Sequence, residues 1–336
     1  SRRRSDRGRY GRNPIGGLGR GRKPTACSKR YSDLVPDVNT SPDDLIQPFM
    51  IEASGLRGRL IRMGPTLSDV IRRHDLPPTV QSLMAEFAVL AATLSAALKF
   101  DGVFSLQAKG NGPVGLMAAD ISSDGGVRAY ASVSDGVPSP GEIKGSPIPR
   151  LLGAGYLAFT VDQGEHTELY QGIVELQGAT LIECVHHYFQ QSDQFSAAIT
   201  LAAAPDGDGG WRGGALMLQR LPEGELSIRK EKMDEAWRRA TVLMSSCEKD
   251  ELTGRALSAH ELLFRLFHED GVRVFDTHPL RFSCRCSRER AQGILTMLSQ
   301  EDIEEYKIEG RISITCEFCN TEEWFDSAEI DAARAT

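Results

Sequence analysis

The chain has 336 residues, of which 40% are hydrophobic and 25% are charged. This length exceeds the roughly 250–300 residues at which one hydrophobic core stops growing, so we expect more than one domain. The composition is that of a soluble globular protein and excludes collagen and coiled coil, and the longest nearly apolar stretch, Ala88–Leu98, is too short to cross a bilayer.

Residues 1–44 are predicted to be a disordered basic extension. Residues 1–31 hold nine Arg, two Lys and one Asp, a net charge of +10, and the rest of the chain carries −17. The acidic body argues against nucleic-acid binding by the folded part. The extension is interpreted as a solvated segment without a role, an organelle-targeting leader or an RNA-binding arm. We expect a cytoplasmic protein, or an organellar one if the extension is a leader.

Residues 45–226 are predicted to form an α+β core domain built on antiparallel sheet. Alternating apolar residues from Pro48 and again at Arg59–Met63 indicate strands. A central helix follows, because apolar side chains recur at helical spacing over residues 80–98. Turn signals at Lys109–Gly112 and Asp124–Gly126 then divide a three-stranded meander. Further elements are expected at residues 156–161, 170–176, 180–191, 195–203 and 215–219.

Residues 227–280 are predicted to be a metastable helical linker. Lys230–Glu248 is a charged helix with a thin apolar stripe, and Glu261–Phe267 is a second, shorter helix. Short helices gain most of their stability by docking, so the apolar faces of this segment must lie on another part of the molecule.

Four of the seven cysteines form two close pairs in residues 281–330, which we expect to be a small zinc domain. Cys284 and Cys286 form Cys-x-Cys, and after 29 intervening residues Cys316 and Cys319 form Cys-x-x-Cys. Two such pairs are typical of a closed tetrahedral site that holds one Zn²⁺ through four thiolates. The other three cysteines, Cys27, Cys184 and Cys247, are scattered; Cys184 is interpreted as a buried thiol on a helix and Cys247 as a bystander.

The same cluster also suits a redox switch. An extended Cys-x-Cys places its Cα atoms near the limit for a disulfide, so oxidation would bend the backbone and eject the metal. Four arginines near the first pair, together with zinc, favour the thiolate that oxidants attack. Loss of the metal would unfold the small domain. Spacing alone leaves a purely structural zinc site and a redox switch equally open.

The two cysteine motifs and several other stretches resemble those of one protein family. Phe282–Arg290 (FSCRCSRER) and Ile314–Asn320 (ITCEFCN) resemble the zinc domain of the redox-regulated heat-shock holdases, heat-shock protein thirty-three. The resemblance covers residues 45–330 in order, through GNGPVGL at 110–116, GYL at 155–157, YQGIV at 170–174, ELLFRLFH at 261–268 and VRVF at 272–275.

The resemblance implies an ATP-independent chaperone and not an enzyme. When reduced it would be zinc-bound and inactive. Oxidation would pair Cys284 with Cys286 and Cys316 with Cys319, release zinc, loosen the linker, and yield a homodimer that holds unfolding client proteins during oxidative stress. The basic extension is not part of the family core.

Two functions from other classes remain as alternatives. A zinc-ribbon nucleic-acid-binding protein would use the basic N-terminal arm, but the acidic body speaks against it. A thiol-disulfide oxidoreductase would use Cys316 and Cys319, but it needs a thioredoxin-like βαβ setting that the sequence does not show.

Overall fold

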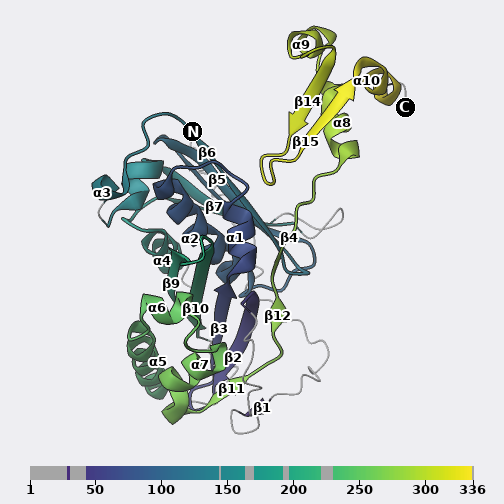
Figure 1. Ribbon diagram of the computed structural model, residues 1–336. Helices are drawn as coiled ribbons and strands as arrows, with labels where there is room; N and C mark the ends of the chain where they lie inside the picture. Colours follow the sequence, from purple (N-terminus) through teal and green to yellow (C-terminus); the bar gives the residue numbers. More distant parts are fainter. Residues whose placement is uncertain are drawn as a thin grey trace, which may run out of the picture.

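The computed structural model describes residues 29–30, 43–143, 145–162, 170–191, 197–220 and 230–334. Two sheets with a helix between them make the body, and the residues from Cys284 onward form a small module (Figure 1). The mixed α+β class with antiparallel sheets is therefore confirmed. Within the described ranges, no helix combines the length and the apolar character that a bilayer crossing requires.

The first sheet has seven strands, and its neighbours run antiparallel. Its order is β1-β11-β2-β3-β10-β9, and β12 also pairs with β2. The bounds are β1 Lys29–Arg30, β2 Leu45–Ile51, β3 Leu56–Met63, β9 Ala197–Pro205, β10 Trp211–Gln219, β11 Val272–Val274 and β12 His278–Pro279.

The second sheet has six strands in the order β13-β6-β5-β4-β7-β8. The expected meander is its centre, and all neighbours are antiparallel except β13, which runs parallel to β6. The bounds are β4 Val103–Gly110, β5 Val114–Ser122, β6 Gly126–Val133, β7 Gly155–Asp162, β8 Tyr170–Glu175 and β13 Arg281–Phe282.

The central helix α2, Pro78–Ser95, lies between the two sheets. Pro77 and Pro78 suit its start, because proline fixes the helical φ and the first turn needs no amide donor. Fourteen of its eighteen residues are buried, and its alanines let both sheets approach closely. The shorter helical elements of the body are α1 Pro65–Ile71, α3 Pro140–Ile143, η3 Ile148–Leu152 and α4 Leu181–Gln191.

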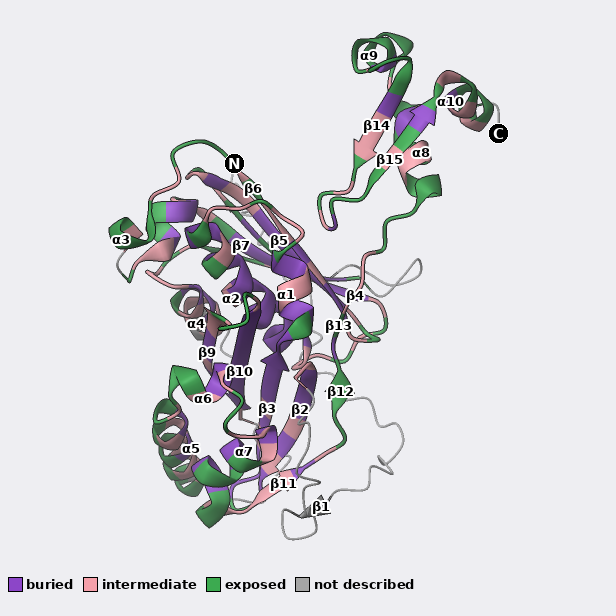
Figure 2. Cartoon of the chain, viewed as in Figure 1, coloured by how far each residue is buried: buried purple, intermediate pink, exposed green. Residues whose placement is uncertain are grey.

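Three helices cover the other face of the first sheet (Figures 1 and 2). They are α5 Lys230–Ser245, α6 Lys249–Thr253 and α7 Ala259–Phe267, followed by the short turn η4 His268–Asp270. Their apolar side chains form a second core with β2, β3 and β10, in which the Phe267 ring lies 5.9 Å from that of Phe49. Short helices are thus stabilised by docking on a sheet, as amphipathic helices generally are.

Residues 272–282 connect this helical layer to the small module through both sheets. The segment pairs with β2 as β11 and β12 and then with β6 of the second sheet as β13. The segment expected to be a helical linker therefore ends as strands, because the edges of two sheets offer its backbone hydrogen-bonding partners. Cys284 follows two residues after β13.

Most of the predicted basic extension, residues 1–28 and 31–42, lies outside the described residues. Within residues 1–44, Lys29–Arg30 pairs with β11, and Asp43 and Asp44 contact the body. Asp43 accepts two hydrogen bonds from Arg212 at 2.6 Å each, and Asp44 accepts one from the Gly64 amide at 2.8 Å. The ordered domain includes these two acidic residues, which the sequence pattern placed in the extension.

The small module folds around a hairpin and three helices. Its elements are α8 Arg288–Met297, α9 Gln300–Glu305, β14 Arg311–Thr315, β15 Glu322–Asp326 and α10 Ser327–Arg334. Five buried side chains form its core: Leu295, Ile303, Ile312, Phe325 and Ile330. So small a core supplies little stability, which makes a metal site in this module physically reasonable.

Candidate metal centre

The first cysteine pair lies in the extended stretch between β13 and α8. The stretch ends where Ser287 caps α8 by accepting a hydrogen bond from the Arg290 amide at 3.3 Å. Cys286 is exposed and Cys284 is half-buried. The strand before the pair and the helix cap after it define the path of the backbone, so both sulfurs reach the second pair.

The second pair occupies the turn between β14 and β15. The Cys316 amide donates to Thr321 O at 2.9 Å, and the Asn320 amide donates to Cys316 O at 2.8 Å. Asn320 has a φ of 54°, a left-handed conformation that asparagine adopts more readily than most residues. This tight turn directs both sulfurs toward the first pair, and the turn is followed by a strand rather than by the helix of a thioredoxin-like site.

All four sulfur atoms lie within 4.8 Å of one another. Cys284 Sγ is 3.6 Å from Cys316 Sγ, and Cys286 Sγ is 3.4 Å from Cys319 Sγ. A tetrahedral zinc with bonds of about 2.3 Å needs sulfurs about 3.8 Å apart. The four cysteines that the spacing brought together as candidates are thus clustered in space, at distances that suit a closed site with four thiolates.

The thiols of the cluster differ in how readily they ionise. Burial opposes ionisation of Cys319, but hydrogen bonding with the hydroxyl and the amide of Thr321 and with the neighbouring Cys286 and Cys284 outweighs it and lowers the pKa of the thiol to about 7. Burial raises the pKa of Cys316, and burial together with Cys284 raises that of Cys286. Burial thus opposes ionisation of Cys316 and Cys286, and a bound cation would favour their thiolate form.

Two other cysteines of the described chain lie apart from the cluster. Cys184 is fully buried on α4, and burial raises the pKa of its thiol to about 11. Burial, reinforced by the charge of Glu251, likewise raises the pKa of Cys247 to about 11. Both therefore stay protonated at neutral pH and react slowly with oxidants. Cys27 lies outside the described residues.

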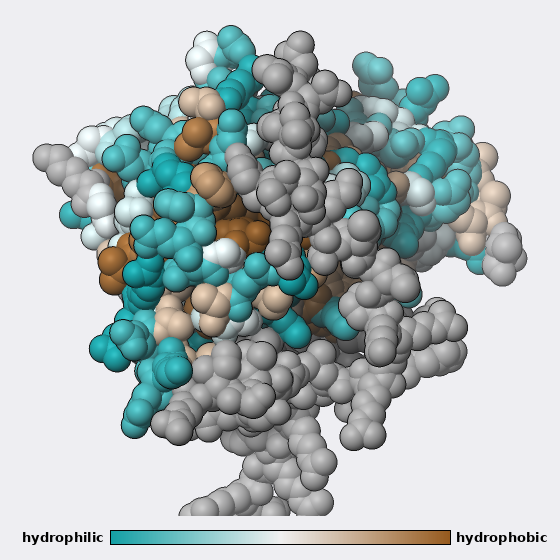
Figure 3. Space-filling model, turned by 90° about the horizontal axis from the view of Figure 1, so that it is seen from below, coloured by the Kyte–Doolittle hydropathy of each residue, from teal (hydrophilic) through white to brown (hydrophobic). Residues whose placement is uncertain are grey.

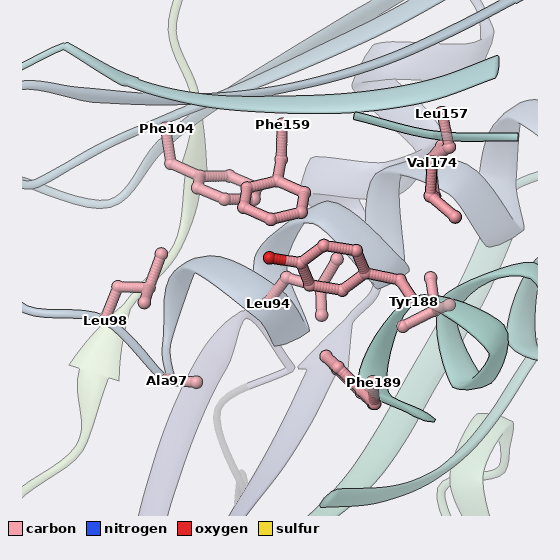
Figure 4. Close-up of a pocket in the computed structure, with 10 residues that line it drawn as sticks. Leu94, Ala97, Leu98, Phe104, Leu157, Phe159, Val174, Tyr188 and Phe189 are labelled. Carbon is pink, nitrogen blue, oxygen red and sulfur yellow. The ribbon is translucent and has the colours of Figure 1, made fainter. Parts of the chain in front are cut away.

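An apolar pocket of about 30 Å³ opens between α2, α4 and the second sheet (Figure 4). The rings of Phe104, Phe159 and Tyr188 gather on it, and the Tyr188 hydroxyl is the only polar side-chain group among the lining residues. The pocket offers no converging acid, base or nucleophile, so it lacks the groups that orient a substrate.

The cluster also contacts the body of the molecule, through residues that the sequence did not single out. Arg128 of β6 lies 3.8 Å from Cys284 Sγ, and its guanidinium covers the Phe318 ring at 3.9 Å. The Asn320 side chain donates a hydrogen bond to Arg73 O at 2.5 Å. The sequence does not predict these contacts, because Arg128 lies in an ordinary strand pattern far from the cysteine motifs.

Comparison with known proteins gives a consistent result. The family model described as "Hsp33 protein" matches residues 44–326. The "33 kDa chaperonin" of Caulobacter vibrioides is 37% identical over 301 residues, covering 86% of this chain and 96% of the relative. That of Pseudomonas fluorescens Pf-5 is 38% identical over 292 residues, covering 86% and 93%.

A solved structure shares the fold. The 33 kDa chaperonin (heat shock protein 33 homolog) of Thermotoga maritima superimposes with a TM-score of 0.74 at 21% identity, covering 88% of this chain and 98% of that one. From the family model and the bacterial relatives together, the chain belongs to the Hsp33 family of chaperones.

Proposed function

We propose that the protein is a redox-regulated, ATP-independent holdase that is zinc-bound and inactive when reduced and is activated by disulfide formation. One observation carries the proposal: four sulfurs within 4.8 Å of one another lie in a module whose own core has five buried side chains. A metal would therefore contribute a large part of the module's stability, and its loss would unfold the module.

In the reduced state Cys284, Cys286, Cys316 and Cys319 would hold one Zn²⁺ as thiolates. Bound zinc supplies folding free energy, on the order of 10–16 kcal/mol in small zinc domains. Two elements of the chain position the ligands: the β14–β15 turn holds Cys316 and Cys319, and the extended stretch after β13 holds Cys284 and Cys286.

Activation would consist of two oxidations by a peroxide. One thiolate of a pair attacks hydrogen peroxide, becomes a sulfenic acid and releases hydroxide. The second thiolate attacks that sulfur, forms the disulfide and releases another hydroxide, so each pair gives two electrons to one peroxide. We propose that Cys284 pairs with Cys286 and Cys316 with Cys319, because an unfolded module no longer holds its distant pairs together.

Unfolding of the module, residues 281–330, would then loosen the linker, residues 227–280, from the core, residues 45–226. Few residues separate the module from the linker. β13 ends two residues before Cys284, and the linker strands β11 and β12, which pair with the first sheet, come directly before β13. Such short edge pairings contribute little stability once the module no longer anchors them.

Release of α5–α7 would expose the surface that holds clients. Their side chains Ala240, Met244, Leu262, Leu263 and Phe267 are buried against the first sheet, so their release would uncover apolar surface on both partners. In the docked state, the described residues on the face seen from below in Figure 3 are mostly hydrophilic, with apolar areas between them. Apolar surface of this kind would bind unfolded chains without ATP and would also promote a homodimer.

The test is an aggregation assay on a chemically denatured client protein. The purified, zinc-loaded chain should not suppress light scattering when reduced, and it should suppress scattering without ATP after treatment with peroxide. Equal suppression before and after oxidation would reject redox regulation, and no suppression in either state would reject the holdase.

A further inference from the structure

One arginine of the second sheet contacts both Cys284 of the first cysteine pair and Phe318, which lies between the cysteines of the second pair. We infer that Arg128 is a positioning residue that holds the module docked on the sheet only while both pairs are gathered around one metal. The inference deepens the proposed function and rests on it, since it assumes that the four cysteines bind zinc. It assigns the regulation of the module to a residue of the core domain.

The guanidinium of Arg128 is oriented by the sheet itself. Its Nε and Nη2 donate to Asp120 Oδ2 at 2.9 and 2.6 Å, and Ser105 donates to Asp120 Oδ1 at 2.6 Å. The three residues lie directly opposite one another on β4, β5 and β6. The side chains of Asp120 and Arg128 are only 10% and 13% exposed. Two charge-assisted hydrogen bonds to one carboxylate oxygen thus orient the guanidinium in the docked state.

The free side of the same guanidinium faces the module. Nη1 lies 3.8 Å from Cys284 Sγ of the first pair. The guanidinium plane lies 3.9 Å over the ring of Phe318, which stands between Cys316 and Cys319 of the second pair. Tyr130, also on β6, contacts the same ring edge-on at 4.7 Å. Both contacts form together only when the two pairs are close to each other.

Charge makes this contact specific for the reduced, metal-bound state. Four thiolates with one divalent cation carry a formal charge of minus two, which attracts a guanidinium. Arg285, between the cysteines of the first pair, donates to Asp120 Oδ2 at 3.1 Å and adds a second positive group. Two disulfides are neutral, so oxidation removes both the attraction and the geometry that brings Cys284 beside Phe318.

Arg128 remains charged in this enclosed place. A guanidinium does not lose its proton in proteins, and its hydrogen bonds to Asp120 stabilise the charge here. The positive charge that faces the sulfurs is therefore permanent across the physiological range.

The experiment compares the full-length, reduced, zinc-loaded protein with its R128Q variant. Hydrogen exchange at residues 283–286 and 316–320 reports docking, and a chromophoric chelator reports the rate of zinc release in peroxide. We expect both rates to rise about tenfold in R128Q, the effect of losing a charge-assisted contact, while one zinc per chain is still bound before oxidation. R128K keeps the positive charge but lacks the planar guanidinium, so its hydrogen-exchange and zinc-release rates should lie between those of the wild type and R128Q.

The matched control is R212Q, which also removes a buried arginine–aspartate pair but lies on the first sheet, where its partners Asp43 and Thr253 belong to the body. The double variant D120N/R128Q removes the buried carboxylate together with the guanidinium, in case R128Q alone fails to fold. Unchanged rates in R128Q, or an equal rise in R212Q, would overturn the inference. Holdase assays are not needed for this readout, so a failure of docking control is distinguishable from a failure of the proposed chaperone activity.

Discussion

Cys284 Sγ lies 3.6 Å from Cys316 Sγ, although the two residues are 32 positions apart in the chain. Only the folded module brings them together, and the module has few apolar side chains with which to stay folded. Metal binding, module folding and the thiol state are therefore coupled, and each can be measured through the others.

Removal of one proposed ligand should weaken zinc binding and unfold the module. C319S deletes the most buried sulfur of the cluster and should lower zinc affinity by at least about a hundredfold, since even indirect partners of a ligand cost 10–100-fold. Competition with a chelator measures the affinity. C247S, outside the cluster, is the control and should bind zinc normally. Unchanged affinity in C319S would remove Cys319 from the ligand set.

Oxidation should leave two specific disulfides and two specific thiols. Peptide mapping by mass spectrometry after peroxide should find Cys284 joined to Cys286 and Cys316 joined to Cys319. Cys184 and Cys247 should remain reduced, because burial raises the pKa of each to about 11 and leaves little thiolate at neutral pH. Disulfides that join Cys284 to Cys316, or Cys286 to Cys319, would show instead that the module stays folded while it is oxidised.

The docking of α7 should set how easily the linker is released. Phe267 is fully buried and stacks on Phe49, so F267A should destabilise the docked helix by about 3–5 kcal/mol. We expect this variant to suppress client aggregation partly even when it is reduced. F264A removes the same kind of side chain from the same helix at a position that is 42% exposed, and it should behave as wild type. Equal behaviour of the two variants would mean that α7 does not limit activation.

The free energy of unfolding should depend on pH through the ionisation of the Asp43 carboxyl group. The hydrogen bonds from Arg212 outweigh burial and lower the pKa of Asp43, so the ionised form is favoured by folding. Its contribution is present above the usual aspartate range and is lost as pH falls through the lowered pKa. D43N should cost about 1–3 kcal/mol at pH 7, because a buried guanidinium loses its charged partner. Urea unfolding at about pH 7 and pH 3 should show this difference shrinking in acid; a constant difference would contradict the assignment.

Elements with strong periodic patterns were predictable from the sequence. The stripe of α2 and the alternation of β4–β6 arise from burial on regular faces, and the structure confirms both. The clustering of the four cysteines was predictable for a different reason, because metal ligands recur at short spacings that local geometry imposes.

Elements that depend on distant partners were not predictable. The helix α8 buries only Leu295, so its own stripe is weak, and it is stabilised by packing on α10 and β15. The pairing of residues 272–282 with two different sheets has no local signature. Arg128 is 156 positions from Cys284, and nothing in its neighbours distinguishes it from a solvated strand arginine.

The most direct test follows zinc, free thiols and client holding in one sample during oxidation. The account predicts one zinc per chain at the start, loss of four thiols and of the zinc in parallel, and holding activity that rises with them. Full holding activity while the zinc and all four cluster thiols are still in place would contradict it.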